Sequence, residues 1–124
     1  MAQSVDIKFI EKAEAELGVS LPNWYRVSMQ SLNGGSVSFG GEAWELYPIL
    51  DLTNKKSIRK TGDNLVLNQK SAQDWPGFPS NAIAIGENGT GDHIVLLILD
   101  GGIADTRVYH WLHETGKCID VTNA

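Results

Sequence analysis

The stretch from residue 86 to residue 93, GENGTGDH, holds the residue types most suggestive of chemistry in this chain. Glycine amides can cradle a phosphate, and the terminal Asp92 and His93 could bind a metal ion. Phosphate loops, however, join a strand to a helix, whereas this stretch separates two apolar, strand-like segments, and its glycine spacing does not match the dinucleotide fingerprint. Because Asn88-Gly89 favours positive backbone dihedrals, we predict a β-hairpin turn here.

Three histidines and one cysteine complete the set of metal-ligand residue types near this stretch. His110 and His113 have the three-residue spacing that brings two ligands together on a helix. The surrounding sequence, VYHWLH, is strand-like, and strand residues three apart point to opposite faces. We therefore expect surface or hydrogen-bonded structural histidines, with no metal and no cofactor. A small enzyme or metal protein is a hypothesis motivated by residue type alone. The residues in question are Asp92, His93, His110, His113 and Cys118.

Catalytic patterns of other kinds are weaker. Cys118 could pair with His113, but no nucleophile elbow or cysteine-enzyme signature surrounds it, and free cysteines are usually buried small hydrophobes. The carboxylates of Glu42 and Glu45 occupy strand or loop ends, where solvated side chains are expected. We predict that the protein is not an enzyme.

Length and composition predict one globular domain over residues 1–124, with 42% hydrophobic residues available for a core. The first residues lack the basic start and apolar run of a signal peptide, and the longest apolar run, residues 94–99, is too short to cross a bilayer. We expect a cytoplasmic protein that makes no membrane contact.

Charge divides the chain into three segments. Residues 1–54 carry three bases and seven acids, residues 55–70 carry five and one, and residues 71–124 carry two and seven, so −4, +4 and −5 add to −5. A fold that joins the two acidic segments would repel nucleic acid and attract a basic protein, although ordinary solubilising charge accounts for the same numbers. The basic segment has no interleaved aromatics, which favours a solvated helix face over a nucleic-acid site. Its clustered bases are Lys55, Lys56, Arg59 and Lys60.

Two amphipathic helices are predicted at the start of the chain. The first covers residues 4–17, with Ser4 as its N-cap and Gly18 as its left-handed C-cap. Glu11, Glu14 and Glu16 fall mostly off its apolar stripe. The second begins at Pro22, which suits a first helical turn, and is closed by the glycines after Asn33. The two stripes comprise Ile7, Ile10, Ala13, Leu17, Trp24, Tyr25, Ser28, Met29 and Leu32.

The rest of the chain is mainly strand-like. Helices are predicted at residues 54–60, capped by residues 51–53, and at residues 64–73, and a turn-rich connector follows at residues 75–79. The strands after this connector follow one another at hairpin spacing, which predicts an antiparallel meander. The predicted strands are residues 36–39, 43–50, 82–86, 93–99, 107–112 and 117–121.

Several short motifs also occur in a characteristic order. IEKAEAELGVSLPNWY at residues 10–25 precedes LNGG at residues 32–35, and IAIG, GTGD and VYHW with HE follow at residues 83–86, 89–92 and 108–114. This series resembles the SUKH superfamily, which includes a fungal regulator of cell-wall assembly and many bacterial immunity proteins. Segment 54–73 has no counterpart in that pattern.

The resemblance implies a single α+β domain in which N-terminal helices pack on a curved antiparallel β-sheet. It also implies a non-catalytic immunity protein that binds and neutralises a cognate polymorphic toxin, often a nuclease. A nuclease presents a basic surface to its substrate, so an acidic inhibitor would gain association rate from electrostatic steering. Aromatic residues can anchor such an interface. We predict that the partner contacts Glu42, Trp44, Glu45, Asp51, Trp75 and Asp92.

Alternatives remain at this point. Trp44 and Trp75 lie near polar turns or edges, but packing accounts for them equally well, as it does for Trp24 and Trp111. A regulatory or scaffolding domain of the same fold, with a non-toxin partner, is the alternative function. The sequence allows a monomer or a weak dimer, since edge strands permit pairing without requiring it.

Overall fold

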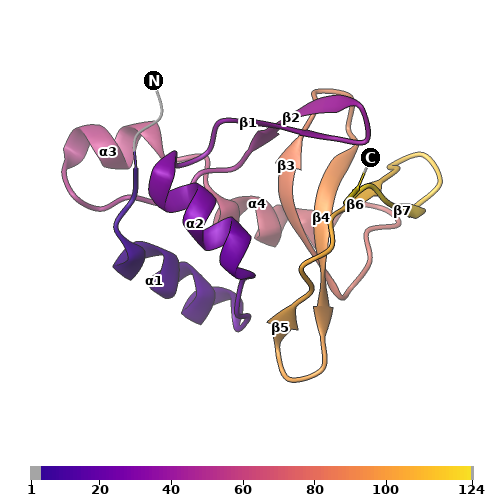
Figure 1. The fold of residues 1–124 in the computed structure, drawn as a ribbon, viewed down its shortest axis with the longest axis horizontal. Helices are drawn as coiled ribbons and strands as arrows, with labels where there is room; N and C mark the ends of the chain where they lie inside the picture. The colour runs from indigo at the N-terminus through magenta and orange to yellow at the C-terminus, as the bar shows by residue number, and fades with distance from the viewer. Residues whose placement is uncertain (1–3, 124) are drawn as a thin grey trace.

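The computed structural model describes residues 4–123 as a group of helices beside a curved antiparallel sheet (Figure 1). The helices are α1 (Ile7–Leu17), α2 (Asn23–Ser31), α3 (Lys55–Lys60) and α4 (Leu65–Ala72). The strands are β1 (Ser36–Phe39), β2 (Glu42–Leu46), β3 (Ala82–Glu87), β4 (His93–Leu99), β5 (Ile103–Ala104), β6 (Tyr109–Trp111) and β7 (Cys118–Asp120). The strand order is β1-β2-β3-β4-β6-β7, with β5 paired to β4 and every pairing antiparallel. The predicted α+β class and the meander are confirmed.

The first two helices form much as their sequence predicts. Gly18 ends α1 in the left-handed conformation, with φ of 68°, as expected. The N-cap is not Ser4 but Asp6, because the Asp6 carboxylate accepts a hydrogen bond from the Lys8 amide at 3.0 Å. Tyr25 and Met29 on α2 are fully buried, so these members of the predicted stripe face the core, whereas Leu32 after the helix is 43% exposed.

Glu14 of α1 links this helix to α2 by hydrogen bonds, although a position off the apolar stripe of α1 predicts a solvent-facing residue. It is 9% exposed, its carboxylate accepts hydrogen bonds from Arg26, and the Leu21 amide donates to it at 2.7 Å. A buried carboxylate requires such partners, because leaving it unpaired costs several kcal/mol.

The centre of the sheet is buried on both faces. Residues 82–86 of β3 and the first four residues of β4 are buried, which matches their nearly continuous apolar sequence. The register shifts between Ala84 and Gly86, and a side-chain carbon at Gly86 would lie 2.8 Å from the Glu45 carbonyl oxygen. From α4, Gln69 donates to the Ala82 carbonyl at 2.9 Å and accepts from the Ala84 amide at 3.0 Å. Its amide group therefore hydrogen-bonds to backbone groups of β3 that do not pair with a neighbouring strand.

The sheet curls until its two ends approach each other. The turn between β1 and β2 lies against the segment after β7, since a side-chain carbon at Gly40 would be 2.9 Å from Val121 Cγ1. Trp24 of α2 spans the same region, because its ring contacts Phe39 and its indole nitrogen donates to the Thr106 carbonyl at 3.0 Å. This closure confirms the curved sheet that the resemblance implies.

Several predicted boundaries are wrong. Strand β2 ends at Leu46 rather than at residue 50, because the chain then leaves the sheet toward α3. Asn54, and not residues 51–53, caps α3 by accepting from the Ser57 amide at 2.8 Å. Strand β5 was not predicted, since its two residues lie in a glycine-rich polar link, and β6 and β7 are shorter than expected. Within residues 4–123, no helix has both the length and the apolar character that crossing a bilayer requires.

Candidate protein-binding surfaces

The GENGTGDH stretch is a hairpin turn between β3 and β4, as predicted. Gly89 and Gly91 have φ of 84° and 100°, which glycine adopts without strain. The Asn88 side chain accepts hydrogen bonds from the Thr90 amide at 3.1 Å and the Thr90 hydroxyl at 2.6 Å. The turn is thus held by its own side chains.

Asp92, at the end of this turn, is the centre of a histidine-bridged cluster composed of Glu42, Asp92, His110 and His113. Its carboxylate accepts from His110 Nε2 at 2.8 Å, from His113 Nδ1 at 2.5 Å and from the His113 amide at 3.0 Å. On the far side of the His110 ring, Nδ1 lies 3.6 Å from the Glu42 carboxylate. The prediction that the two histidines point to opposite faces is therefore wrong. Because β6 ends at Trp111, His113 lies in the following turn, where strand alternation no longer applies.

The Asp92 carboxylate is held in its charged form. Burial alone would raise its pKa, but hydrogen bonds from the His110 and His113 side chains and from the His113 amide outweigh burial and lower the pKa to about 2. Only 15% of the Asp92 side chain is exposed, so it connects the β3–β4 turn to the chain after β6 rather than projecting toward solvent. In the described part of the chain, no group of three or more His, Cys, Asp or Glu residues is placed to hold a metal ion.

A second group of carboxylates lies on one face of the sheet, which we call the outer face. This face is defined by Glu45, Glu87, His93 and Trp75. Glu45 and Glu87 are directly opposite each other in the pairing of β2 with β3, and Glu87 is also opposite His93 in the pairing of β3 with β4. The Ser36 hydroxyl donates to Glu45 at 2.6 Å. No Lys or Arg nitrogen within residues 4–123 lies within 4.0 Å of either carboxylate. Like charges in this arrangement repel and lower the stability of the sheet.

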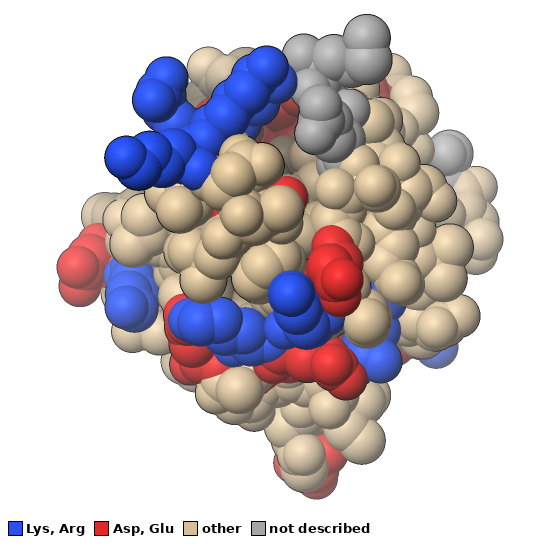
Figure 2. Space-filling model, turned by 90° about the vertical axis from the view of Figure 1, so that its left-hand side faces the viewer, with Lys and Arg blue, Asp and Glu red and all other residues tan. Residues whose placement is uncertain are grey.

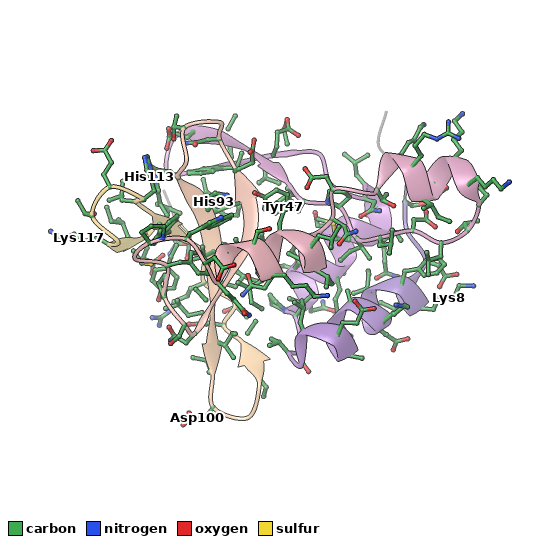
Figure 3. All side chains as sticks on the ribbon, turned by 180° about the vertical axis from the view of Figure 1, so that it is seen from behind. Lys8, Tyr47, His93, Asp100, His113 and Lys117 are labelled. Atoms are coloured by element: carbon green, nitrogen blue, oxygen red, sulfur yellow. The ribbon has the colours of Figure 1, made fainter. Side chains whose placement is uncertain are left out.

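Aromatic rings continue the outer face beside this carboxylate pair. Trp75 is half-buried, and its ring centroid lies 4.3 Å from that of His93 and 6.0 Å from that of Trp111. The Tyr47 hydroxyl donates to His93 Nε2 at 2.9 Å while His93 Nδ1 donates to the Gly91 carbonyl at 3.1 Å. Burial lowers the pKa of His93, so its ring is neutral and belongs to the packing beneath Trp75. Figure 3 shows Tyr47 and His93 close together at the same level of the sheet.

Trp44 does not contribute to either surface. It is 1% exposed, its indole nitrogen donates to the Phe39 carbonyl at 3.1 Å, and its ring meets the His110 ring edge-on at a centroid distance of 4.8 Å. The expectation that Trp44 contacts a partner is corrected, because residues alternate along β2 and Trp44 points inward where Glu45 points outward.

Comparison with known families assigns the fold independently. Residues 4–124 match the model of the SMI1 / KNR4 family (SUKH-1), which covers nearly the whole chain. The chain belongs to the SUKH-1 family. This family includes immunity proteins. Comparisons with curated proteins and with solved structures found no match.

A groove of about 370 Å³ separates the outer face of this SUKH-1 chain from α3. Glu45 lines it from β2, and Asp51 and Lys60 line it from the α3 side. Asp51 is fixed there because its amide donates to the Thr61 hydroxyl at 2.9 Å and its carboxylate accepts from the Thr53 amide at 2.9 Å. The six predicted contact residues therefore divide: Glu45, Asp51 and Trp75 lie around the outer face and groove, Glu42 and Asp92 lie in the histidine-bridged cluster, and Trp44 is buried.

The basic helix α3 borders the same groove. Helix α3 buries none of its side chains, and Figure 2 shows its Lys and Arg side chains gathered near the top of that view. The prediction of a solvated basic helix face is confirmed in this SUKH-1 chain.

Sequence reasoning missed Glu87. A usable signal was its place beside the Asn88-Gly89 turn, since the pairing of the strands flanking a hairpin turn sets which side chains share a face. The partner strand β2, however, is more than thirty residues earlier in the chain, and no local pattern predicts that Glu45 lies opposite Glu87.

Proposed function

We propose that this SUKH-1 chain is an immunity protein that binds a cognate toxin protein and neutralises it without catalysis. The partner-contacting surface is the outer face with the adjoining groove, and the partner presents a basic surface to Glu45, Glu87 and Asp51. Trp75 supplies an aromatic anchor at the end of this surface. The site of action in this proposal is the cytoplasm.

The observation that carries the proposal is the pair of opposed carboxylates, Glu45 and Glu87. Their repulsion lowers stability, and no cation of the described chain relieves it. A partner's Lys or Arg placed between them would relieve the repulsion on binding. The arrangement therefore lowers folding stability but strengthens binding of a basic partner. It also supports the prediction that the two acidic segments of the sequence meet, since Glu45 comes from the first segment and Glu87 from the last.

A non-catalytic role agrees with the chemistry of the polar clusters. The carboxylate of Asp92 is already occupied by three donors, and His93 is neutral and enclosed by rings. Neither group is available to transfer a proton to a ligand in solvent.

The test is co-expression of this chain with the product of the gene immediately upstream, with growth and complex formation scored together. Rescue of growth with co-purification is the expected result. A toxic product that binds this chain and remains toxic would contradict neutralisation. If the product is neither toxic nor bound, a regulatory or scaffolding domain with a non-toxin partner becomes the better account.

A further inference from the structure

Helix α3 is held in place by hydrogen bonds at its two ends rather than by packing. Asn54 caps its start, and at its end the Thr61 hydroxyl donates to the Ser57 carbonyl at 2.8 Å and accepts from the Asp51 amide at 2.9 Å. A six-residue helix does not persist in water without such support. Since Ile58 is also 41% exposed, the chain orders this helix without using it to enclose the core.

The cations on α3 repel one another. Lys55 and Arg59 are four residues apart, as are Lys56 and Lys60, so each pair lies on one face of the helix and lowers its stability. No acidic side chain in the described part of the chain forms an ion pair with any of the four. The cationic helix is therefore uncompensated in the same way as the opposed carboxylates of the outer face.

The two uncompensated surfaces meet at one groove. Lys60 and Ser57 line it on the α3 side together with Asp51, Glu45 lines it on the β2 side, and Gly34 and Gly35 also line it. Despite sharing this groove, Glu45 and Lys60 do not form an ion pair. A groove of about 370 Å³ thus lies between surfaces of opposite charge.

We infer that the toxin docks across this groove. An acidic patch of the toxin contacts α3, and an adjacent basic patch of the toxin contacts Glu45 and Glu87. This inference rests on the proposed function and adds to it the charge pattern of the partner. A partner with only basic charge would be attracted to the outer face and repelled by α3. A partner with adjacent basic and acidic patches satisfies both surfaces in one orientation, because reversing it would place like charges together.

The test makes α3 acidic, because the two charge patterns of the partner then predict opposite changes in affinity. Lys56→Glu with Lys60→Glu makes the protein more acidic, and attraction to a purely basic toxin would then strengthen. Contact of α3 with an acidic patch predicts the reverse, an affinity at least about tenfold weaker, because two attractive contacts become repulsive. The measurement is the Kd of the purified variant for the inactivated product of the upstream gene, at two salt concentrations.

Three controls separate the outcomes. Lys8→Glu with Lys117→Glu carries the same charge change on residues that neither belong to α3 nor line the groove, and is expected to leave affinity within about threefold. Lys56→Gln with Lys60→Gln is expected to fall between wild type and the reversal. Circular dichroism checks that α3 and the sheet are retained.

Each result is decisive. Unchanged or tighter binding by the folded Lys56→Glu, Lys60→Glu variant would overturn the contact with α3 while leaving the proposed function intact. Failure of the wild-type protein to bind the upstream product would instead overturn the proposed function, and this inference with it.

Discussion

The two groups of carboxylates in this protein have opposite environments. Asp92 in the histidine-bridged cluster accepts three hydrogen bonds from His110 and His113. Glu45 and Glu87 on the outer face lie opposite each other, and within residues 4–123 only the Ser36 hydroxyl donates a hydrogen bond to either side chain. Acidic residues at strand ends look alike in sequence. The hydrogen-bonded carboxylate therefore stabilises the fold, whereas the repelling pair lowers its stability and is the part of the surface where we propose that a basic partner binds.

The largest expected effect is on partner binding. Glu45→Lys with Glu87→Lys should weaken binding of the upstream gene product by about a hundredfold, since two attractive contacts become repulsive. Isothermal titration calorimetry on purified proteins measures this change. Asp92→Asn provides the contrast and should alter Kd by less than about threefold. Equal losses in the two variants would mean that the outer face is not the contact surface.

The next effect is on folding stability. Asp92→Asn should lower the free energy of unfolding by about 2 kcal/mol, because charge-assisted hydrogen bonds to both histidines are lost. Urea denaturation followed by tryptophan fluorescence measures it. Thr90→Ala serves as a control in the same turn and should have a smaller effect. Wild-type stability in Asp92→Asn would show that the cluster contributes nothing to the fold.

Lowering the pH should remove the contribution of Asp92 to the free energy of unfolding. The pKa of Asp92 is lowered to about 2 from an ordinary value of 3.8, so its contribution is present above the ordinary value and is lost as pH falls from about 4 to about 2. After allowance for solvent screening, wild type should lose about 1 kcal/mol more than Asp92→Asn across this interval. Denaturant titrations at pH 5 and pH 2.5 compare the two proteins. Parallel losses would contradict the low pKa.

The smallest effect should be a gain. Glu87→Gln removes one of the opposed charges and should raise the free energy of unfolding by about 0.5 kcal/mol, because cross-strand repulsion is relieved. Thermal denaturation at low salt measures the gain, and added salt should reduce the difference by screening. Destabilisation by this substitution would show that Glu87 is already paired favourably within the folded chain.

The sequence by itself determined the helices, most strands and the nature of the glycine-rich turn. Gly18 and the apolar stripe predicted α1, and Asn88-Gly89 predicted the hairpin, because caps, periodicity and positive φ are local properties of the chain. The ordered motifs also predicted the family and the α+β class. Boundaries failed where a polar residue nearby offered an alternative cap, as with Asp6 and Asn54.

Only the tertiary structure decided which side chains share a surface. Strand alternation and long-range pairing place Trp44 in the core, bring Glu45 opposite Glu87, and join two histidines at Asp92 through a turn after β6. These contacts link residues far apart in the chain, so no local pattern encodes them. The same holds for the groove, because the position of α3 beside β2 depends on the hydrogen bond from the Asp51 amide to the Thr61 hydroxyl, which forms only when the chain folds.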